Sequence, residues 1–354
     1  MLEAALSHFG FTELPFSSDW RGEIFESKDF RDTRTAVDSA IERHSKLLVT
    51  APIGAGKTEA ADEAIRRAKE RWDRTAEEPL LVVPLLARAK NQLTVSAVED
   101  TLHDALGISG SSRREVRARR LHQALESRLA SGGRVALVID EAHDLTARVL
   151  RELKTLHELR SSTGRPLFAM ILVAQDTIRS FMKIHALHLW QRIRVHELKG
   201  LRRDEIEPYL RLKLEEAGAP KTFSPDAIGA VKKSQATWLP LDLNQLCQQA
   251  LHDAWRRGEK QVSAETVEIV LRPNLLFALM KQKGLSQNEL AGVSGVPAST
   301  LSTFFTRPEE MSAQKREEVR SKLVAGLTKT AAREPDKSRM VIGTPVDGAK
   351  GKAA

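Results

Sequence analysis

One eight-residue segment constrains this chain more than any other. Ala51–Thr58 has the sequence APIGAGKT, directly after the apolar run LLVT and directly before a polar helical stretch. Glycines in such a turn let successive backbone N–H groups point at phosphate oxygens, and the helix that follows adds its positive dipole end. The first glycine of the usual pattern is Ala51 here, but that position makes the turn, so a small residue is tolerable. The segment predicts a nucleotide-phosphate site, and an incidental glycine-rich turn is the lesser alternative.

The side chains around this segment predict ATP and Mg²⁺ as the cofactors. Lys57 would reach the β- and γ-phosphates, and the Thr58 hydroxyl would ligate Mg²⁺. The residues that we expect to contact the cofactor are Pro52, Ile53, Gly54, Ala55, Gly56, Lys57, Thr58 and Glu59.

A second apolar run ends in two carboxylates. Val135–Ile139 is followed by Asp140 and Glu141, about eighty residues after the glycine-rich turn. Ligands of open parallel sheets bind outside the carboxyl ends of the strands. Asp140 is therefore expected to hold the Mg²⁺ shell and Glu141 to polarise the attacking water. His143, the last letter of a DEAH string, is interpreted as a helix-start residue.

Two further residues are catalytic candidates. Gln175 follows the run Pro166–Ala174, where a polar side chain could sense hydrolysis at the γ-phosphate. Arg192 comes just after the last expected core helix, a position that suits an arginine finger offered to a neighbouring subunit's nucleotide. A surface or salt-bridge role is the alternative for Arg192.

Residues 46–196 alternate short apolar runs with polar helical stretches. The runs KLLVTAP, LLVVPLL, RVALVIDEA and PLFAMILVAQ are apolar at both odd and even positions. This pattern is typical of strands buried on both faces of a parallel sheet, and the alternation predicts an α/β fold. Residues 197–271 lack such runs and are predicted to be helices.

A compact helical pattern occupies residues 274–325. Ser286 and Glu289 form a capping box for one helix, Gly295–Pro297 make a turn, and Ala298–Phe305 form a second helix. The expected interior is Leu290, Ala291, Val296, Leu301 and Phe305.

The same pattern resembles the helix-turn-helix of lambda-repressor-like domains. The resemblance implies that the second helix enters the major groove of double-stranded DNA. The expected DNA contacts are Ser299, Thr300, Thr303 and, near the backbone, Gln287; a helical hairpin for protein contact is the alternative.

Charge and composition narrow the class of protein. Hydrophobic residues make up 41% and charged residues 29% of the 354 residues, as in globular domains. Residues 271–354 carry 14 Lys+Arg and 8 Asp+Glu, a net charge of +6 out of +8, which favours a polyanionic partner. The single cysteine, Cys247, excludes an internal disulfide, and no apolar run approaches the ~18 residues of a membrane span. We expect a cytoplasmic protein without membrane association and without a secretory signal.

Together these motifs resemble the AAA+ ATPase superfamily, and within it the clade of ExeA-type ATPases and the MuB, TnsC and TniB transposition ATPases. The matching features are FGFTELPF, IDEAHDL, the strand ending at Gln175, Gln191–Ile193 and the helical stretch through Leu246 and Cys247. The resemblance covers about residues 5–272 and implies a P-loop αβα sandwich, a small helical lid and ATP-driven oligomers. Relatives place a sensor arginine after a proline of the lid, where this chain has Leu241.

The predicted organisation has five parts. They are a leader segment (1–45), an AAA+ core (46–196), a helical lid (197–272), a helix-turn-helix domain (274–325) and a basic, disordered tail (326–354). Arg88 and Lys90 follow the second apolar run, where ring ATPases present pore loops to DNA, so they are further candidate DNA contacts.

The first functional hypothesis is an ATPase that assembles as a ring or helical filament on DNA and recruits or activates a transposase or integrase. Hydrolysis of ATP to ADP and phosphate would drive disassembly, slowly or with a partner's help because the lid arginine is missing. The alternatives are an ATP-gated helix-turn-helix transcriptional regulator and an ExeA-like secretion ATPase.

Overall fold

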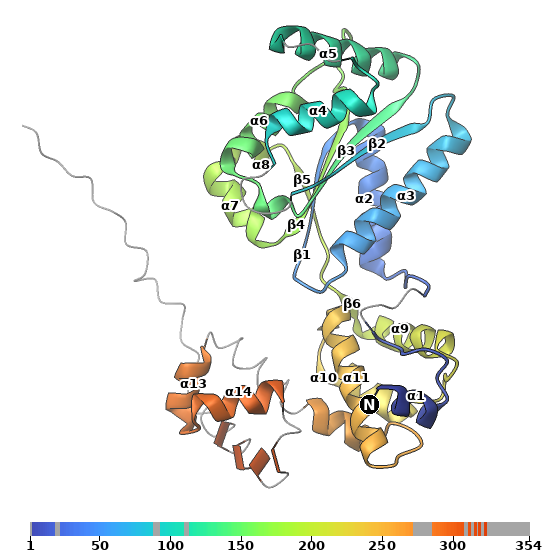
Figure 1. Ribbon diagram of the computed structural model, residues 1–354, viewed down its shortest axis with the longest axis vertical. Coiled ribbons are helices and arrows are strands. Elements are labelled where there is room, and N and C mark those ends of the chain that lie inside the picture. The colour runs from blue at the N-terminus through green and yellow to red at the C-terminus, as the bar shows by residue number, and fades with distance from the viewer. Residues whose placement is uncertain are drawn as a thin grey trace, which may run out of the picture. The chain divides into compact units, whose positions relative to one another are not determined.

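The computed structural model describes residues 2–17, 22–87, 93–109, 113–271 and 285–307, with the short pieces 311–312, 315–316, 318–319 and 322–323 (Figure 1). The chain divides into two compact units, Met1–Ser263 and Ala264–Ala354. The break falls a few residues before the predicted end of the lid, and the predicted domain boundaries stay predictions. None of the helices in the described ranges is both long enough and apolar enough to cross a bilayer.

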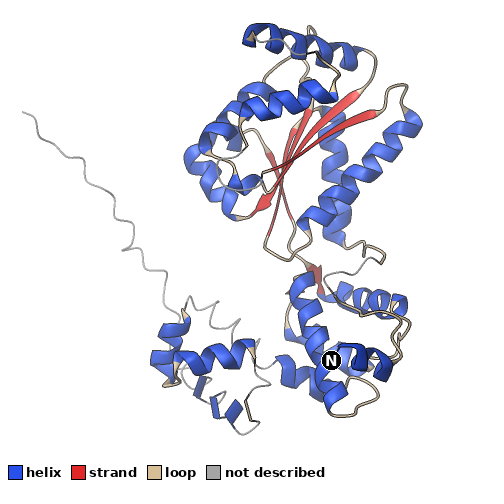
Figure 2. Ribbon diagram, viewed as in Figure 1, coloured by secondary structure: helices blue, strands red, loops and turns tan. Residues whose placement is uncertain are grey.

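The first unit is built on one parallel sheet, which lies between layers of helices (Figure 2). Its strands follow the order β2-β3-β4-β1-β5. They are β1 (Lys46–Ala51), β2 (Leu80–Leu86), β3 (Arg134–Asp140), β4 (Ala169–Gln175) and β5 (Arg194–Glu197). The predicted α/β fold and the four predicted strands are confirmed.

The two edge strands differ from the expectation. β2 was expected to be buried on both faces, but most of its residues are partly or fully exposed, because an edge strand is covered less completely than a central one. β5 was not predicted: its four residues, RVHE, contain one apolar side chain and give no apolar run. It forms by pairing with β1 over Leu47–Thr50.

Helices cover both faces of the sheet, as an αβα sandwich requires (Figure 1). One face carries α2 (Lys28–Arg43) and α3 (Lys57–Thr75), whose alanine-rich sides pack on Leu47 and Val49. Leu48 points to the opposite core, as alternation along a strand demands. The helices on that side are α4 (Val95–Ala105), α5 (Arg114–Ala130), α6 (Ala147–His157), α7 (Thr177–His185) and α8 (Leu187–Trp190), with the 3₁₀ turn η1 (Ala142–Asp144).

The region predicted to be the lid follows the sheet and lies in the same unit, apart from its last residues. It contains α9 (Arg203–Glu216), α10 (Pro225–Ser234) and α11 (Pro240–Arg256). The prediction that this region has no strands was wrong in one detail, since β6 (Leu201–Arg202) and β7 (Thr237–Trp238) pair antiparallel. Two-residue strands are too short to leave a periodic pattern.

The first part of the leader segment packs on the helices that follow the sheet, whereas its last part is α2, which covers the sheet. Phe16 is 2% exposed and its ring makes an edge contact with Phe223, while its carbonyl accepts a hydrogen bond from Gln248 Nε2 at 2.9 Å. The Thr12 N–H donates to the Ala217 carbonyl, and α1 (Leu2–Phe9) packs on α11. The apolar letters of FGFTELPF therefore supply lid core.

The second unit contains α13 (Gln287–Ser294) and α14 (Ala298–Thr306). The predicted capping box of Ser286 and Glu289 is confirmed, and Gly295, in the left-handed region, ends α13. Phe304, at 2% exposure, belongs to the interior although it was not predicted there, because it lies three residues after Leu301 on the same helix face. The expected Phe305 and Ala291 are half-buried and pack against this interior. The buried cluster is Leu290, Val296, Leu301, Phe304, Val319 and Leu323.

Candidate nucleotide site

The glycine-rich turn connects β1 to α3 as the sequence predicted. Gly54 and Gly56 have φ values of 83° and 80°, which L side chains rarely adopt, so glycine is required at both positions. Gly56 also precedes the first residue of α3, so the free N–H groups of the helix open onto the turn. Ala55 is buried, and Ile53 is 70% exposed.

Residues from two distant segments meet at this turn. Lys57 Nζ lies 2.7 Å from Glu141 Oε1, and the Thr58 hydroxyl donates to Asp140 Oδ2 at 3.1 Å. Asp140 Oδ1 accepts the N–H of Glu141 at 2.7 Å, which fixes the orientation of the carboxylate. The structure thus brings together the four residues on which the predicted chemistry depends.

The oxygen donors suit a small, hard cation. Mg²⁺ usually takes one or two protein oxygens and completes its shell with water and substrate phosphates. The Thr58 hydroxyl and the Asp140 carboxylate, already within hydrogen-bond distance of each other, would supply those two ligands. Nowhere in the described ranges do three or more His, Cys, Asp or Glu side chains gather in a metal-binding group.

Gln175 lies at the carboxyl ends of the strands, and Arg192 lies near their amino ends. Gln175 ends β4 and pairs in register with Ala51, so it lies beside the start of the glycine-rich turn. Arg192 precedes β5 and therefore lies near the amino ends of the strands, where its guanidinium forms an ion pair with Glu158 at 2.8 Å. The structure brings Gln175 to the site but not Arg192, and the roles of both stay predictions.

The lid reaches the glycine-rich turn through Leu241. The Leu241 N–H donates to the Gly54 carbonyl at 3.1 Å, and a Cβ placed on Gly54 would lie only 2.6 Å from the Leu241 Cβ. Leu241, the second residue of α11, therefore touches the turn with both its backbone and its apolar side chain. The family resemblance implies a sensor arginine at this position.

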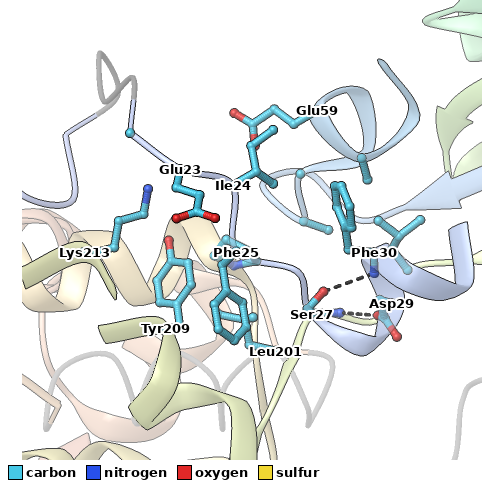
Figure 3. A pocket seen from close by; sticks show the side chains of 17 residues that line it. Glu23, Ile24, Phe25, Ser27, Asp29, Phe30, Glu59, Leu201, Tyr209 and Lys213 are labelled. Carbon is cyan, nitrogen blue, oxygen red and sulfur yellow. Dashed lines mark hydrogen bonds between the residues drawn. The ribbon is translucent and has the colours of Figure 1, made fainter. Parts of the chain in front are cut away.

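A pocket beside the turn was missed by the sequence reasoning. Its walls come from residues 22–27, α2, the start of α3, Leu198–Leu201 and the lid (Figure 3). Tyr209 and Lys213 lie on one side of it and Phe30 on the other. Ala55, Gly56 and Glu59 of its wall were predicted as cofactor contacts, whereas the other wall segments carry no motif, so the sequence signalled only one side of the pocket.

Burial shapes the polar groups of this pocket. It lowers the pKa of Lys213, against the opposing effect of nearby carboxylates that include Glu59. Burial also raises the pKa of Tyr209, whose hydroxyl donates to Asn244 Oδ1 at 2.7 Å.

Cys247 in α11 is buried as expected, and burial raises the pKa of its thiol, which excludes a reactive thiolate.

The candidate DNA contacts have different exposures. Ser299 is exposed, whereas Thr300, Thr303 and Gln287 are half-buried. The exposed surface of α14 also includes Ser302 and Thr306, which the sequence reasoning missed although they lie three and seven residues beyond Ser299. Arg88 and Lys90 lie outside the described residues.

Comparisons with known proteins agree with this geometry. Residues 41–182 match the family model described as AAA domain. General secretion pathway protein A of Aeromonas hydrophila is 28% identical over 141 residues, which are 39% of this chain and 25% of that protein. This chain therefore spans about a quarter of that relative's length.

Solved structures extend the comparison to the fold. The ORC2 protein of Aeropyrum pernix in its ADPNP–ADP complexes has a TM-score of 0.52 and 15% identity, over 88% of this chain and 89% of that chain. Its ADP form has a TM-score of 0.52 and 14% identity, over 90% and 85%. The fold matches that of P-loop AAA+ proteins. At such low identity the likeness concerns the fold alone.

Proposed function

We propose that this chain is an ATP-dependent DNA-binding ATPase that oligomerises on double-stranded DNA and acts in transposition. The observation that carries the proposal is the convergence of Lys57, Thr58, Asp140 and Glu141 at the carboxyl ends of β1 and β3. The AAA domain match and the ADPNP and ADP complexes of the similar ORC2 protein support a nucleotide ligand. The role in transposition rests on the sequence resemblance to the clade of MuB, TnsC and TniB.

The arrangement suggests how the nucleotide binds. Backbone N–H groups of Gly54–Thr58 would hold the phosphates. The Lys57 ammonium would leave Glu141 and contact phosphate oxygens instead. Mg²⁺ would neutralise charge on the β- and γ-phosphates from its position on Thr58 and Asp140. The adjoining pocket, with the aromatic ring of Tyr209 and the amine of Lys213, offers a place for the base and the ribose.

Hydrolysis needs a water in line with the γ-phosphate and a base beside it. Glu141 would accept a proton from that water. The water oxygen would attack the γ-phosphorus while the bond between this phosphorus and ADP breaks. Gln175, at the end of β4, would contact the γ-phosphate side of the site. Arg192 of the same chain cannot reach this place, because the six residues of β1 separate the carboxyl and amino ends of the strands by roughly 20 Å. We assign it to the nucleotide of a neighbouring copy.

Exposed apolar residues support contact between copies. Ile184 and Leu187, on α7 and α8 shortly before Arg192, are 73% and 47% exposed. Ile53 and Leu241, beside the glycine-rich turn, are 70% and 42% exposed. A head-to-tail contact between copies would cover both groups and bring Arg192 to the neighbour's phosphates.

The second unit is proposed to bind duplex DNA. Its hydroxyl-bearing helix α14, with Ser299, Ser302 and Thr306 exposed, can contact phosphates and several bases but carries no bidentate base reader. The net charge of +6 over residues 271–354 supports an electrostatic, weakly selective interaction.

The test is retention of the full chain on duplex DNA with Mg-ATP, with Mg-ADP and without nucleotide. We expect retention only with Mg-ATP, and release as ATP is consumed. Glu141→Gln should bind ATP and stay on the DNA, because hydrolysis is blocked while the phosphate contacts remain. A chain lacking residues 274–354 should bind more weakly and with a flatter salt dependence.

The outcomes separate the parts of the proposal. Retention that ignores the nucleotide would contradict ATP-driven assembly, and fast release of Glu141→Gln would remove Glu141 from catalysis. Unchanged DNA binding after deletion of residues 274–354 would exclude the second unit as the DNA site.

Two other functions each have one supporting observation. The apolar contact of Leu241 with Gly54, in place of a charged lid residue, favours slow turnover and hence an ATP-gated transcriptional regulator. Operator-specific binding by residues 274–325 alone would support this regulatory role.

The likeness to General secretion pathway protein A supports a secretion ATPase. ATPase stimulation by duplex DNA would count against that role.

A further inference from the structure

Glu141 is held between two nitrogen atoms. Its Oε1 lies 2.7 Å from Lys57 Nζ, and its Oε2 lies 3.3 Å from Nε2 of His143. His143 was expected only to start a helix, but its imidazole instead turns back onto the carboxylate two residues before it. Both oxygens of the predicted base therefore have a nitrogen neighbour.

The backbone holds this histidine in place. Glu141 has φ 52° and ψ 34°, a left-handed conformation that is unusual for a residue with a side chain and is often kept at functional sites. The turn closes with the Asp144 N–H donating to the Glu141 carbonyl at 2.9 Å. Ala142 and Leu145 are buried and anchor the turn in the core, so the His143 ring has little freedom to leave.

The ring is also largely enclosed. The His143 side chain is 15% exposed, and its Nδ1 atom is buried without a hydrogen-bond partner among the described residues. Of the two ring nitrogens, Nε2 is the one that faces Glu141 Oε2, and an N–H at this atom would be the donor to the carboxylate. The polar atom that faces Glu141 is thus the one through which this histidine interacts.

The two neighbours of Glu141 differ in what a nucleotide would do to them. Lys57 is needed at the phosphates and would leave Oε1 free for a water, whereas His143 has no such second task. We infer that His143 is a positioning residue, which keeps Glu141 oriented toward the attacking water once Lys57 has moved to the nucleotide. This inference rests on the proposed ATPase function. A general base must be held within hydrogen-bond reach of the proton that it accepts, and contacts of this kind tighten when the substrate is bound.

The test compares three variants of the full chain. His143→Ala removes the contact, His143→Gln keeps an N–H donor at a similar reach, and His8→Ala removes an exposed histidine of α1 as the matched control. The measurements are the single-turnover rate of ATP hydrolysis, the Michaelis constant, and the dissociation constant of a fluorescent ATP analogue, with and without duplex DNA.

His143→Ala should lower the single-turnover rate on the order of 10- to 100-fold, while the dissociation constant stays within about twofold. His143→Gln should recover most of the rate, and His8→Ala should match the wild type. A structural role would instead alter analogue binding and thermal stability, and Gln would not restore the rate.

Two negative results have different meanings. If the wild type hydrolyses ATP and His143→Ala does so equally fast, or if His143→Gln is as slow as His143→Ala, the inference about His143 is overturned and the ATPase proposal stands. If the wild type binds the analogue but hydrolyses no ATP with or without DNA, the ATPase proposal fails, and the positioning role fails with it.

Discussion

The two ends of β1 hold lysines in opposite electrostatic settings. Lys57, beyond the carboxyl end of the strand, forms a 2.7 Å ion pair with Glu141. Lys46, the first residue of the strand, is 8% exposed, and its Nζ lies 3.3 Å from the imidazole Nδ1 of His157. Burial lowers the pKa of Lys46, and nearby arginines act in the same direction. The lysine beyond the carboxyl end of β1 is therefore paired with a carboxylate, whereas the lysine at its amino end is buried against an imidazole.

The side of the sheet where the parallel strands begin, here called the amino edge, contains a buried and neutral histidine. The opposite side, where the strands end, is called the carboxyl edge. His157 is 2% exposed, and burial together with the adjacent Lys46 cation lowers its pKa to about 3. Its Nε2–H donates to the His44 carbonyl at 3.1 Å, which leaves Nδ1 to accept from Lys46. Its ring also makes an edge contact with Phe168. The polar atoms of His157 thus bond α6 to Lys46 and His44, whereas the carboxylates at the carboxyl ends of the strands face the glycine-rich turn.

The largest expected effect separates the two lysines. Lys57→Ala should lower ATP hydrolysis by at least ~100- to 1,000-fold, because it removes a preorganised cation from the phosphates. Lys46→Met should leave hydrolysis within about twofold, because Lys46 lies at the other end of β1. It should lower the free energy of unfolding by about 1–3 kcal/mol, because the buried Nδ1 of His157 loses its hydrogen-bond donor. Steady-state ATPase assays and chemical denaturation measure the two effects. Equal loss of hydrolysis in both variants would remove the distinction between the edges.

A smaller effect concerns pH and the amino edge alone. The pKa of His157 is about 3 in the folded chain and ~6.5 when unfolded, so the unfolded state takes up the proton first as the pH falls. This histidine should therefore lower the free energy of unfolding by about 2 kcal/mol between pH 7 and pH 5. The measurement is urea denaturation at several pH values.

The matched variants for this titration are His157→Gln and His188→Gln. His157→Gln cannot take up a proton and should lose this part of the slope, and His188→Gln controls for the substitution of a histidine as such. An unchanged slope in His157→Gln would show that the imidazole is not kept neutral by the fold.

The carboxyl edge could largely be predicted from the sequence, because its signals are local. The glycine-rich turn and the carboxylates after β3 each occupy a few consecutive residues, and the parallel sheet brings strand ends together. The amino edge carries no motif, and Arg192 revealed nothing of its ion pair with Glu158 until the fold placed it.

Other features depended on contacts that no local pattern encodes. The pocket brings residues 22–27 against Tyr209 and Lys213 of α9, two segments that are distant in the sequence. The approach of His143 to Glu141 depends on one left-handed residue, which the letters DEAH do not reveal. Strand β5 has a polar sequence, and it forms because its backbone pairs with the side of β1 that β4 does not occupy.

The most direct measurement is a structure of the full chain with Mg-ADPNP. We predict phosphates against Gly54–Thr58, a magnesium ion on Thr58 and Asp140, and Lys57 moved from Glu141 to the phosphates. An analogue bound elsewhere would contradict this account, and so would an intact 2.7 Å pair of Lys57 and Glu141 beside bound phosphates.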